Sequence, residues 1–214
     1  MDNSQIKRYE KILKGTTTVG IICSDGVVIG ADSRATMGTF IASKETKKVF
    51  KIDENLGMTV AGGVGDAQEL IRILKVNNEI YKMNEGRPMS PNAATSFLSI
   101  VLQENKMFPF LVQLIVGGLN IENKPMLYSI DPEGGYTEET KFTATGSGTE
   151  LAIGYLEDIY KENISTKEAL KVAAKAISIA ASRDSAVGDA LTLAAITKNG
   201  YSELRQPLEK VGGK

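Results

Sequence analysis

The chain has 214 residues, of which 42% are apolar and 24% charged, as expected for a globular protein with one sizeable core. Its 25 Lys and Arg nearly balance 26 Asp and Glu, and the net charge of −1 gives no electrostatic reason to expect a nucleic acid or an anionic membrane as partner. The chain has no histidine and a single cysteine, Cys23, which excludes histidine-dependent triads, His- or Cys-based metal sites and an intrachain disulfide. An enzyme of this composition must move protons with Lys, carboxylates, Tyr or a terminal amine, and we expect no cofactor.

The cysteine content and the hydropathy of the chain also indicate the cellular compartment. One cysteine fits a reducing compartment, and we expect a cytoplasmic protein. No apolar run reaches the ~18 residues that a membrane span needs. The first 15 residues are charged throughout and lack the apolar segment of a secretory signal. Their apolar residues have helical spacing, but so short an isolated helix is marginal in water.

From Thr16 onward the pattern changes to hairpins and pairs of helices. The predicted elements are strands at 16–23, 27–32, 48–52 and 58–61, helices from about 66 and from 91, strands at 111–116, 126–130 and 142–145, helices at 149–160 and 166–182, the latter capped by Thr166, and strands at 190–197 and 201–204. Regular βαβ alternation is absent. The order therefore predicts an α+β fold with two packed antiparallel sheets and helices outside them.

Gly15-Thr16 marks the boundary between the charged leader and the first strand. Cleavage there would give Thr16 a free α-amine, whose ordinary pKa of about 7.7–8.0 lies close to working pH. One residue would then carry a hydroxyl nucleophile and a nearby base, which suits acyl transfer without histidine. The alternative is that 16–18 is only the start of a strand, since threonine favours strands.

Other candidates have a structural alternative as well. Asp32 ends one predicted strand and Lys48 begins another, so they form either an ordinary surface ion pair or a held ammonium beside a nucleophile. Gly62-Gly63 is either a strand–helix turn or a backbone donor for an oxyanion. The runs 146–148 and 183–185 offer a hydroxyl and a carboxylate, or only a corner and a helix end. Cys23 and the run 107–110 are interpreted as core.

Taken together, these runs resemble the motifs of archaeal-type proteasome β subunits, in the same order and over roughly residues 16–200. The matching runs are TTTVGI at 16–21, GADSRAT at 30–36, KKVFKID at 47–53, TVAGGVGDAQ at 59–68, MFPF at 107–110, GG at 117–118, SID at 129–131, ATGSG at 144–148 and RDS at 183–185. The resemblance implies the N-terminal-nucleophile hydrolase fold, a four-layer αββα sandwich. It also implies a threonine endopeptidase that degrades unfolded proteins inside stacked seven-membered rings (α7β7β7α7) with an ATP-dependent unfoldase at the α ring.

The resemblance also assigns roles along the chain. Residues 1–15 become a propeptide removed by autocatalysis between Gly15 and Thr16, and 16–214 a single peptidase domain. The implied catalytic residues are the nucleophile Thr16, Lys48 oriented by Asp32, the oxyanion donor Gly62, and Ser147 and Asp184 around the threonine amine. The implied substrate-binding residues are Thr36 with Gly62 as strand edges and the pocket residues Ala35, Val60 and Val64, whose apolar character suggests cleavage after apolar residues.

One position departs from the family pattern. A second serine often stands three residues after the helix-end aspartate, where this chain has Val187, which cannot donate a hydroxyl hydrogen bond. The run 148–150 also departs from the usual small residue followed by proline. Two alternatives therefore stay open: a catalytically silent structural β subunit, and another N-terminal-nucleophile hydrolase.

Overall fold

A computed structural model describes residues 15–37 and 39–208. Its elements are β1 (Thr17–Cys23), β2 (Gly26–Asp32), β3 (Ala35–Met37), β4 (Phe40–Ser43), β5 (Val49–Asp53), β6 (Leu56–Gly62), α2 (Val64–Glu85), α3 (Pro91–Glu104), β7 (Val112–Leu119), β8 (Pro125–Ile130), β9 (Tyr136–Glu139), β10 (Phe142–Gly146), α4 (Thr149–Ile159), α5 (Thr166–Arg183), β11 (Ala190–Thr197) and β12 (Gly200–Pro207). The predicted leader helix lies outside the described residues.

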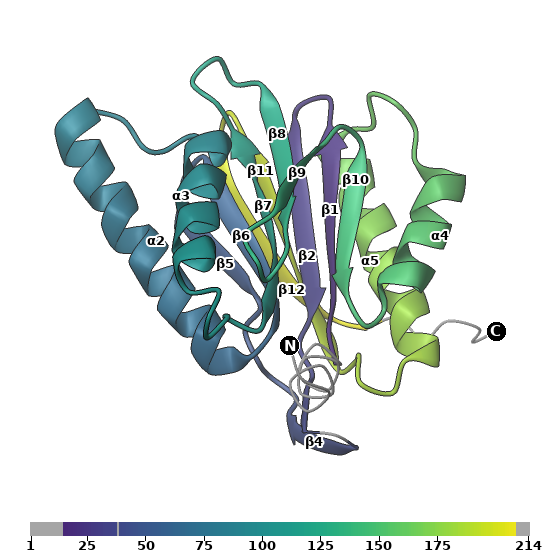
Figure 1. Cartoon of the computed structure of the whole chain (residues 1–214). Coiled ribbons are helices and arrows are strands. Elements are labelled where there is room, and N and C mark those ends of the chain that lie inside the picture. The colour runs from purple at the N-terminus through teal and green to yellow at the C-terminus, as the bar shows by residue number, and fades with distance from the viewer. Residues whose placement is uncertain (1–14, 38, 209–214) are drawn as a thin grey trace.

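Two five-stranded antiparallel sheets stack face to face between two pairs of helices (Figure 1). One sheet has the order β10-β1-β2-β11-β12, and the other β5-β6-β7-β8-β9. Helices α4 and α5 cover the first sheet, and α2 and α3 cover the second. The four-layer αββα sandwich predicted from the sequence is therefore confirmed.

Apolar side chains fill the space between every pair of layers. β2 is buried along its whole length because one of its faces packs on the second sheet and the other on α5. Between the sheets, Val27 and Ile29 of β2 pack with Ile115 and Leu127 of the other sheet. Strands buried on both faces read as continuous apolar runs, which explains the run 27–31.

Several local features differ from the sequence prediction. The hairpin β3–β4 and strand β9 were not predicted, because both are short and mostly exposed and lack a clear apolar alternation. Ser165, not Thr166, caps α5, and it forms a reciprocal capping box with Glu168. Thr166 instead donates its N–H and hydroxyl to Asp25.

The interpretation of 107–110 as core was wrong for its first two residues. Met107 and Phe108 are 78% and 89% exposed, whereas Phe110 packs against the core beneath α2 and α3. The interpretation of Cys23 as a small buried hydrophobe is confirmed: it is buried, and burial raises the pKa of its thiol to about 12. Among the described helices, none combines the length and apolar content needed to cross a membrane.

The topology brings three chain segments to one end of the sandwich. β1 and β2 pair antiparallel with Thr18 opposite Ala31, so the start of β1 lies beside the end of β2. Lys48 immediately precedes β5 in the second sheet. The residues just before β1, just after β2 and just before β5 therefore meet where the two sheets face each other.

Candidate active site

Thr16 lies at the meeting point of the two sheets, one residue before β1. Its side chain is buried, and its hydroxyl donates to the carbonyl oxygen of Gly15 at 2.8 Å. Gly15 has a φ of +117°, and a Cβ there would stand 2.3 Å from the Thr36 hydroxyl oxygen. Only glycine fits this bend, which folds the carbonyl before Thr16 back toward the threonine hydroxyl.

Lys48 approaches the same carbonyl from the second sheet. Its ammonium Nζ lies 3.2 Å from the Gly15 oxygen and 2.9 Å from Oδ1 of Asp32. Both members of this ion pair are buried. Burial lowers the pKa of Lys48, and the negative charge of Asp32 opposes that shift. The Gly15 carbonyl thus accepts hydrogen bonds from a hydroxyl and from an ammonium, which polarise it.

Asp32 is held by a ring of donors. Besides Lys48, the backbone N–H groups of Thr17, Arg34 and Gly188 donate to its two oxygens at 3.0, 3.1 and 3.1 Å. Burial raises the pKa of Asp32, while the Lys48 charge and the N–H groups of Thr17 and Gly188 act against that rise. A carboxylate with this many donors is fixed in orientation, and so is the lysine paired with it.

Ser147 and Asp184 lie on the opposite side of Thr16. The Ser147 hydroxyl oxygen accepts the N–H groups of Gly15 at 3.0 Å and Thr16 at 3.4 Å, and the hydroxyl donates to Oδ2 of Asp184. Asp184 terminates α5, where its own N–H bonds to Ala180. Ser147 and Asp184 therefore form a polar chain that begins at the backbone nitrogen of Thr16.

The glycines near Thr16 are required by close backbone contacts. Gly62 has a φ of +130°, and a Cβ there would come within 2.1 Å of the Leu111 carbonyl oxygen. The Gly63 N–H already donates to that oxygen at 2.9 Å, so of the two glycines Gly62 is the candidate donor for a substrate oxygen. Both line the same cavity as Thr16.

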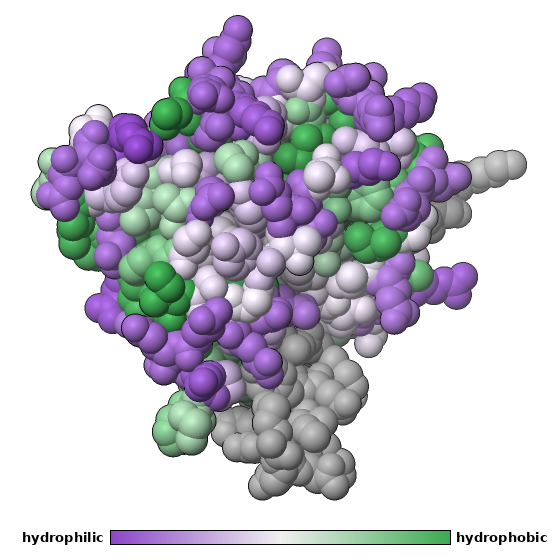
Figure 2. All heavy atoms as spheres, turned by 45° about the horizontal axis from the view of Figure 1, so that its top comes forward, coloured by the Kyte–Doolittle hydropathy of each residue, from purple (hydrophilic) through white to green (hydrophobic). Residues whose placement is uncertain are grey.

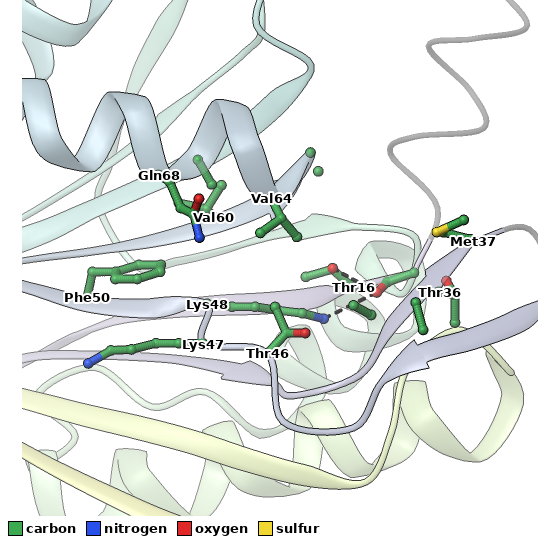
Figure 3. A pocket seen from close by; sticks show the side chains of 16 residues that line it. Thr16, Thr36, Met37, Thr46, Lys47, Lys48, Phe50, Val60, Val64 and Gln68 are labelled. Carbon is green, nitrogen blue, oxygen red and sulfur yellow. Dashed lines mark hydrogen bonds between the residues drawn. The ribbon is translucent and has the colours of Figure 1, made fainter.

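A cavity of about 830 Å³ opens beside Thr16. All four predicted substrate-binding residues line it: Ala35, Thr36, Val60 and Val64. Figure 3 shows Thr16 and Thr36 at one end of this cavity, with Val60 and Val64 on the wall formed by β6 and α2. The cavity is thus a mainly apolar space that starts at the threonine hydroxyl.

Sequence reasoning missed further lining residues. The missed side chains include those of Thr46, Phe50 and Gln68 (Figure 3). Two periodicities could have found them. Thr46, Lys48 and Phe50 alternate along an extended run and so share one face, and Gln68 lies one helical turn after Val64.

Val187 is part of the core. Its side chain is 1% exposed and belongs to the apolar cluster beneath α4 and α5 that also contains Leu191 and Ile177. Its backbone N–H donates to the Asp184 carbonyl at 3.1 Å, as part of the turn after α5. The position that often holds a serine in the family is here part of the core.

The site combines a hydroxyl, an adjacent polarised carbonyl and a buried ammonium. These are suited to acyl transfer from the Gly15 carbonyl to the Thr16 oxygen, because reacting groups held in one place need no separate encounter. Within residues 15–37 and 39–208, no three His, Cys, Asp or Glu side chains come together to hold a metal ion.

Comparison with known proteins gives a consistent result. The profile of the family described as "Proteasome subunit" matches residues 12–196. "Proteasome subunit beta" of Methanosarcina mazei is 48% identical over 195 residues, covering 91% of this chain and 92% of the relative. The protein of the same name from Methanococcus vannielii is 50% identical over 194 residues, covering 91% and 89%. That of Methanococcus maripaludis is 47% identical over 216 residues, covering 99% of both chains.

Proposed function

Since the chain belongs to the proteasome subunit family and matches its β subunits over nearly its whole length, we propose that it is a catalytic β subunit of the proteasome core. The activity proposed is that of a threonine endopeptidase, which degrades unfolded proteins to short peptides. The observation that carries the proposal is the contact of the Thr16 hydroxyl and the Lys48 ammonium with one carbonyl, that of Gly15.

The proposal makes residues 1–15 a propeptide and 16–214 the mature peptidase domain. The Thr16 oxygen attacks the Gly15 carbonyl carbon, the carbon–nitrogen bond breaks, and the hydroxyl proton ends on the released nitrogen. This gives an ester between Gly15 and the Thr16 oxygen. Water then hydrolyses the ester, leaving a Gly15 carboxylate and a Thr16 with free hydroxyl and free amine.

The freed amine then supports cleavage of other chains. Thr16 serves as nucleophile, and Lys48, oriented by Asp32, stabilises the developing alkoxide. Ser147 and Asp184 hold the amine, because their polar chain already meets the Thr16 nitrogen. The Gly62 N–H is the proposed donor to the substrate oxyanion.

The cavity supports a substrate preference. An extended peptide would pair with the edges at Thr36 and Gly62 and place a side chain between Ala35, Val60 and Val64. These walls are apolar, so we expect cleavage after apolar residues. This cavity begins at Thr16, so a side chain bound in it lies next to the bond that is cut.

Family membership implies assembly with α and β subunits. The finer proposal is a stacked α7β7β7α7 particle, served by an ATP-dependent unfoldase and located in the cytoplasm. Exposed apolar side chains at Val76, Ile80 and Met83 form a stripe along α2 at i, i+4 and i+7, as on a surface that another subunit covers. Figure 2 shows one face of the molecule, on which hydrophilic residues separate small hydrophobic patches.

The proposal is tested by Thr16→Ala in particles assembled with the natural α partner. Removing the hydroxyl removes the nucleophile, so we expect the leader to stay attached and peptide hydrolysis to disappear. Thr16→Ser is the matched control, because it keeps the hydroxyl and is expected to retain both activities. Leader removal by Thr16→Ala particles, seen by mass spectrometry, would contradict self-cleavage.

A silent structural subunit is the second candidate, favoured by one observation, the buried Val187 that leaves no hydroxyl at that position. Such a subunit would assemble with its leader attached and cleave nothing. Leader retention in wild-type particles is therefore the result that would favour it.

A further inference from the structure

The 184–189 loop, which joins α5 to β11, contacts both sides of the site. Its first residue, Asp184, accepts the Ser147 hydroxyl through Oδ2 and the Ala186 N–H through Oδ1 at 2.9 Å. Near its other end, the Gly188 N–H donates to Asp32 Oδ2 at 3.1 Å. The loop thus connects Asp184, which bonds to Ser147, with Asp32, which bonds to Lys48.

Arg34 fastens this loop to the end of β2. Its guanidinium donates to the two carboxylate oxygens of Asp189 at 2.8 and 3.4 Å and to the Ser185 carbonyl oxygen at 2.7 Å. Its backbone N–H donates to Asp32 Oδ2 at 3.1 Å. One residue therefore contacts Asp32 directly and the loop that carries Asp184 through three hydrogen bonds.

The backbone makes room for this contact. A Cβ at Gly188 would lie 2.4 Å from the Arg34 guanidinium, and Asp189 has a φ of +70°, which is rare for a residue with a side chain. The planar fork of arginine bonds a carboxylate and a carbonyl together, which a lysine ammonium cannot do in the same geometry. The loop conformation and the guanidinium thus fit each other.

We propose that Arg34 is a positioning residue of the peptidase reaction. It holds the 184–189 loop so that Asp184 and Asp32 keep their positions around Thr16. The inference rests on the proposed function. Arg34 need not touch substrate; it fixes the carboxylates of Asp32 and Asp184, which hold Lys48 and Ser147. Because Val187 belongs to the apolar core, the Arg34–Asp189 ion pair supplies a charged attachment of the loop that Val187 cannot.

The charge of Arg34 adds an effect that a purely structural residue would not have. Burial lowers the pKa of Lys48, and the cation of Arg34 acts in the same direction, while Asp32 and Asp184 oppose it. Removing Arg34 is therefore expected to raise the proton affinity of Lys48. Removing the charge of Asp189, which interacts with Lys48, acts in the opposite direction.

The test compares Arg34→Met, Arg34→Lys and Asp189→Asn in particles assembled with the natural α partner. The probe is a fluorogenic peptide amide with leucine before the scissile bond. We expect Arg34→Met to lower kcat by about ten- to a hundredfold, because small misplacements of reacting groups cost rates of this order, with KM changed little. Arg34→Lys is expected to be intermediate.

The pH profile separates positioning from mere stabilisation. The rising limb of kcat is expected to move to higher pH in Arg34→Met and to lower pH in Asp189→Asn. Arg205→Met, which removes the arginine of the solvent-exposed Arg205–Glu45 ion pair, is the matched control and is expected to leave kcat unchanged.

The inference would be overturned if Arg34→Met kept the wild-type kcat. It would also be overturned if kcat fell in Arg34→Met and Asp189→Asn while the pH profile of both stayed unshifted. If Arg34→Met does not assemble, two results decide in its place: a lowered kcat with an unshifted profile in Arg34→Lys, which keeps the cation, and a shift of the rising limb to lower pH in Asp189→Asn. Wild-type particles that cleave nothing would contradict the proposed function rather than this inference.

Discussion

Two aspartate–lysine pairs in this protein have nearly the same geometry but different surroundings. Asp32 and Lys48 are 2.9 Å apart and almost fully buried between the sheets. Asp53 and Lys82 are 3.1 Å apart where β5 meets α2, and their side chains are 13% and 36% exposed. In both pairs the aspartate ends a strand, so the sequence pattern alone does not tell them apart.

The difference in burial reverses the direction in which the pKa of the lysine is shifted. Burial lowers the pKa of Lys48, whereas the hydrogen bond to Asp53 raises the pKa of Lys82. The pKa of Asp53 is lowered overall, because hydrogen bonds from Asn78, the Glu54 N–H and Lys82 outweigh its partial burial. An ion pair therefore indicates a reactive site when it is buried beside a nucleophile, whereas pairing alone does not.

The largest expected effect comes from breaking the buried pair. Lys48→Met removes the ammonium that donates to the Gly15 carbonyl, so we expect self-cleavage and peptide hydrolysis to fall on the order of 10²–10⁴-fold. Asp32 keeps its three backbone donors, and we expect the variant to assemble. Single-turnover processing followed by mass spectrometry and a peptide assay on purified particles measure both activities.

Lys82→Met is the matched control, because it makes the same substitution in the partly exposed pair. We expect its particles to process the leader and hydrolyse peptides at the wild-type rate. Full activity in Lys48→Met, or an equal loss in both variants, would contradict the distinction between the two pairs.

A smaller effect is expected from substituting Val187, because its side chain is buried. Its side chain packs in the apolar cluster beneath α4 and α5, so Val187→Ser places a hydroxyl among apolar groups and removes a methyl. We expect a loss of about 1–3 kcal/mol in the free energy of unfolding and a peptidase rate within about twofold of wild type. Denaturant unfolding of the separate subunit and a peptide assay on particles check the two parts. A clear gain in rate would mean that the serine turns toward the Thr16 amine.

The smallest effect is expected from breaking the partly exposed Asp53–Lys82 pair, and its size depends on pH. Because the folded pKa of Asp53 lies below its unfolded value, its stabilisation is complete above about pH 4 and is lost as the pH falls through the folded pKa. Asp53→Asn is therefore expected to cost less than about 1 kcal/mol at pH 7 and to cost progressively less below pH 4. Unfolding of both proteins as a function of pH measures the difference. A cost that stays constant down to pH 2 would contradict an ionic contribution.

Sequence reasoning predicted the layers and most elements, because long apolar strands and capped helices carry strong local signals. The resemblance, rather than spacing, brought together Thr16, Asp32 and Lys48, which the structure places within hydrogen-bond range of one another or of one carbonyl. Simple alternation from Lys48 could have added Phe50 to the cavity wall.

Other features had no local signal. Arg34 and Asp189 meet across 155 residues of sequence, and nothing near either residue predicts the contact. The hairpin β3–β4 is too short and exposed to leave a periodic pattern. The burial of Val187 in the core beneath α4 and α5 likewise has no signal in the local sequence pattern.

The central claim is that Thr16 acts on its own chain. The most direct test is the intact mass of this subunit, purified from wild-type particles assembled with the natural α partner. We predict a species that begins at Thr16 and lacks residues 1–15. A full-length mass in fully assembled particles would contradict the claim and identify a silent subunit.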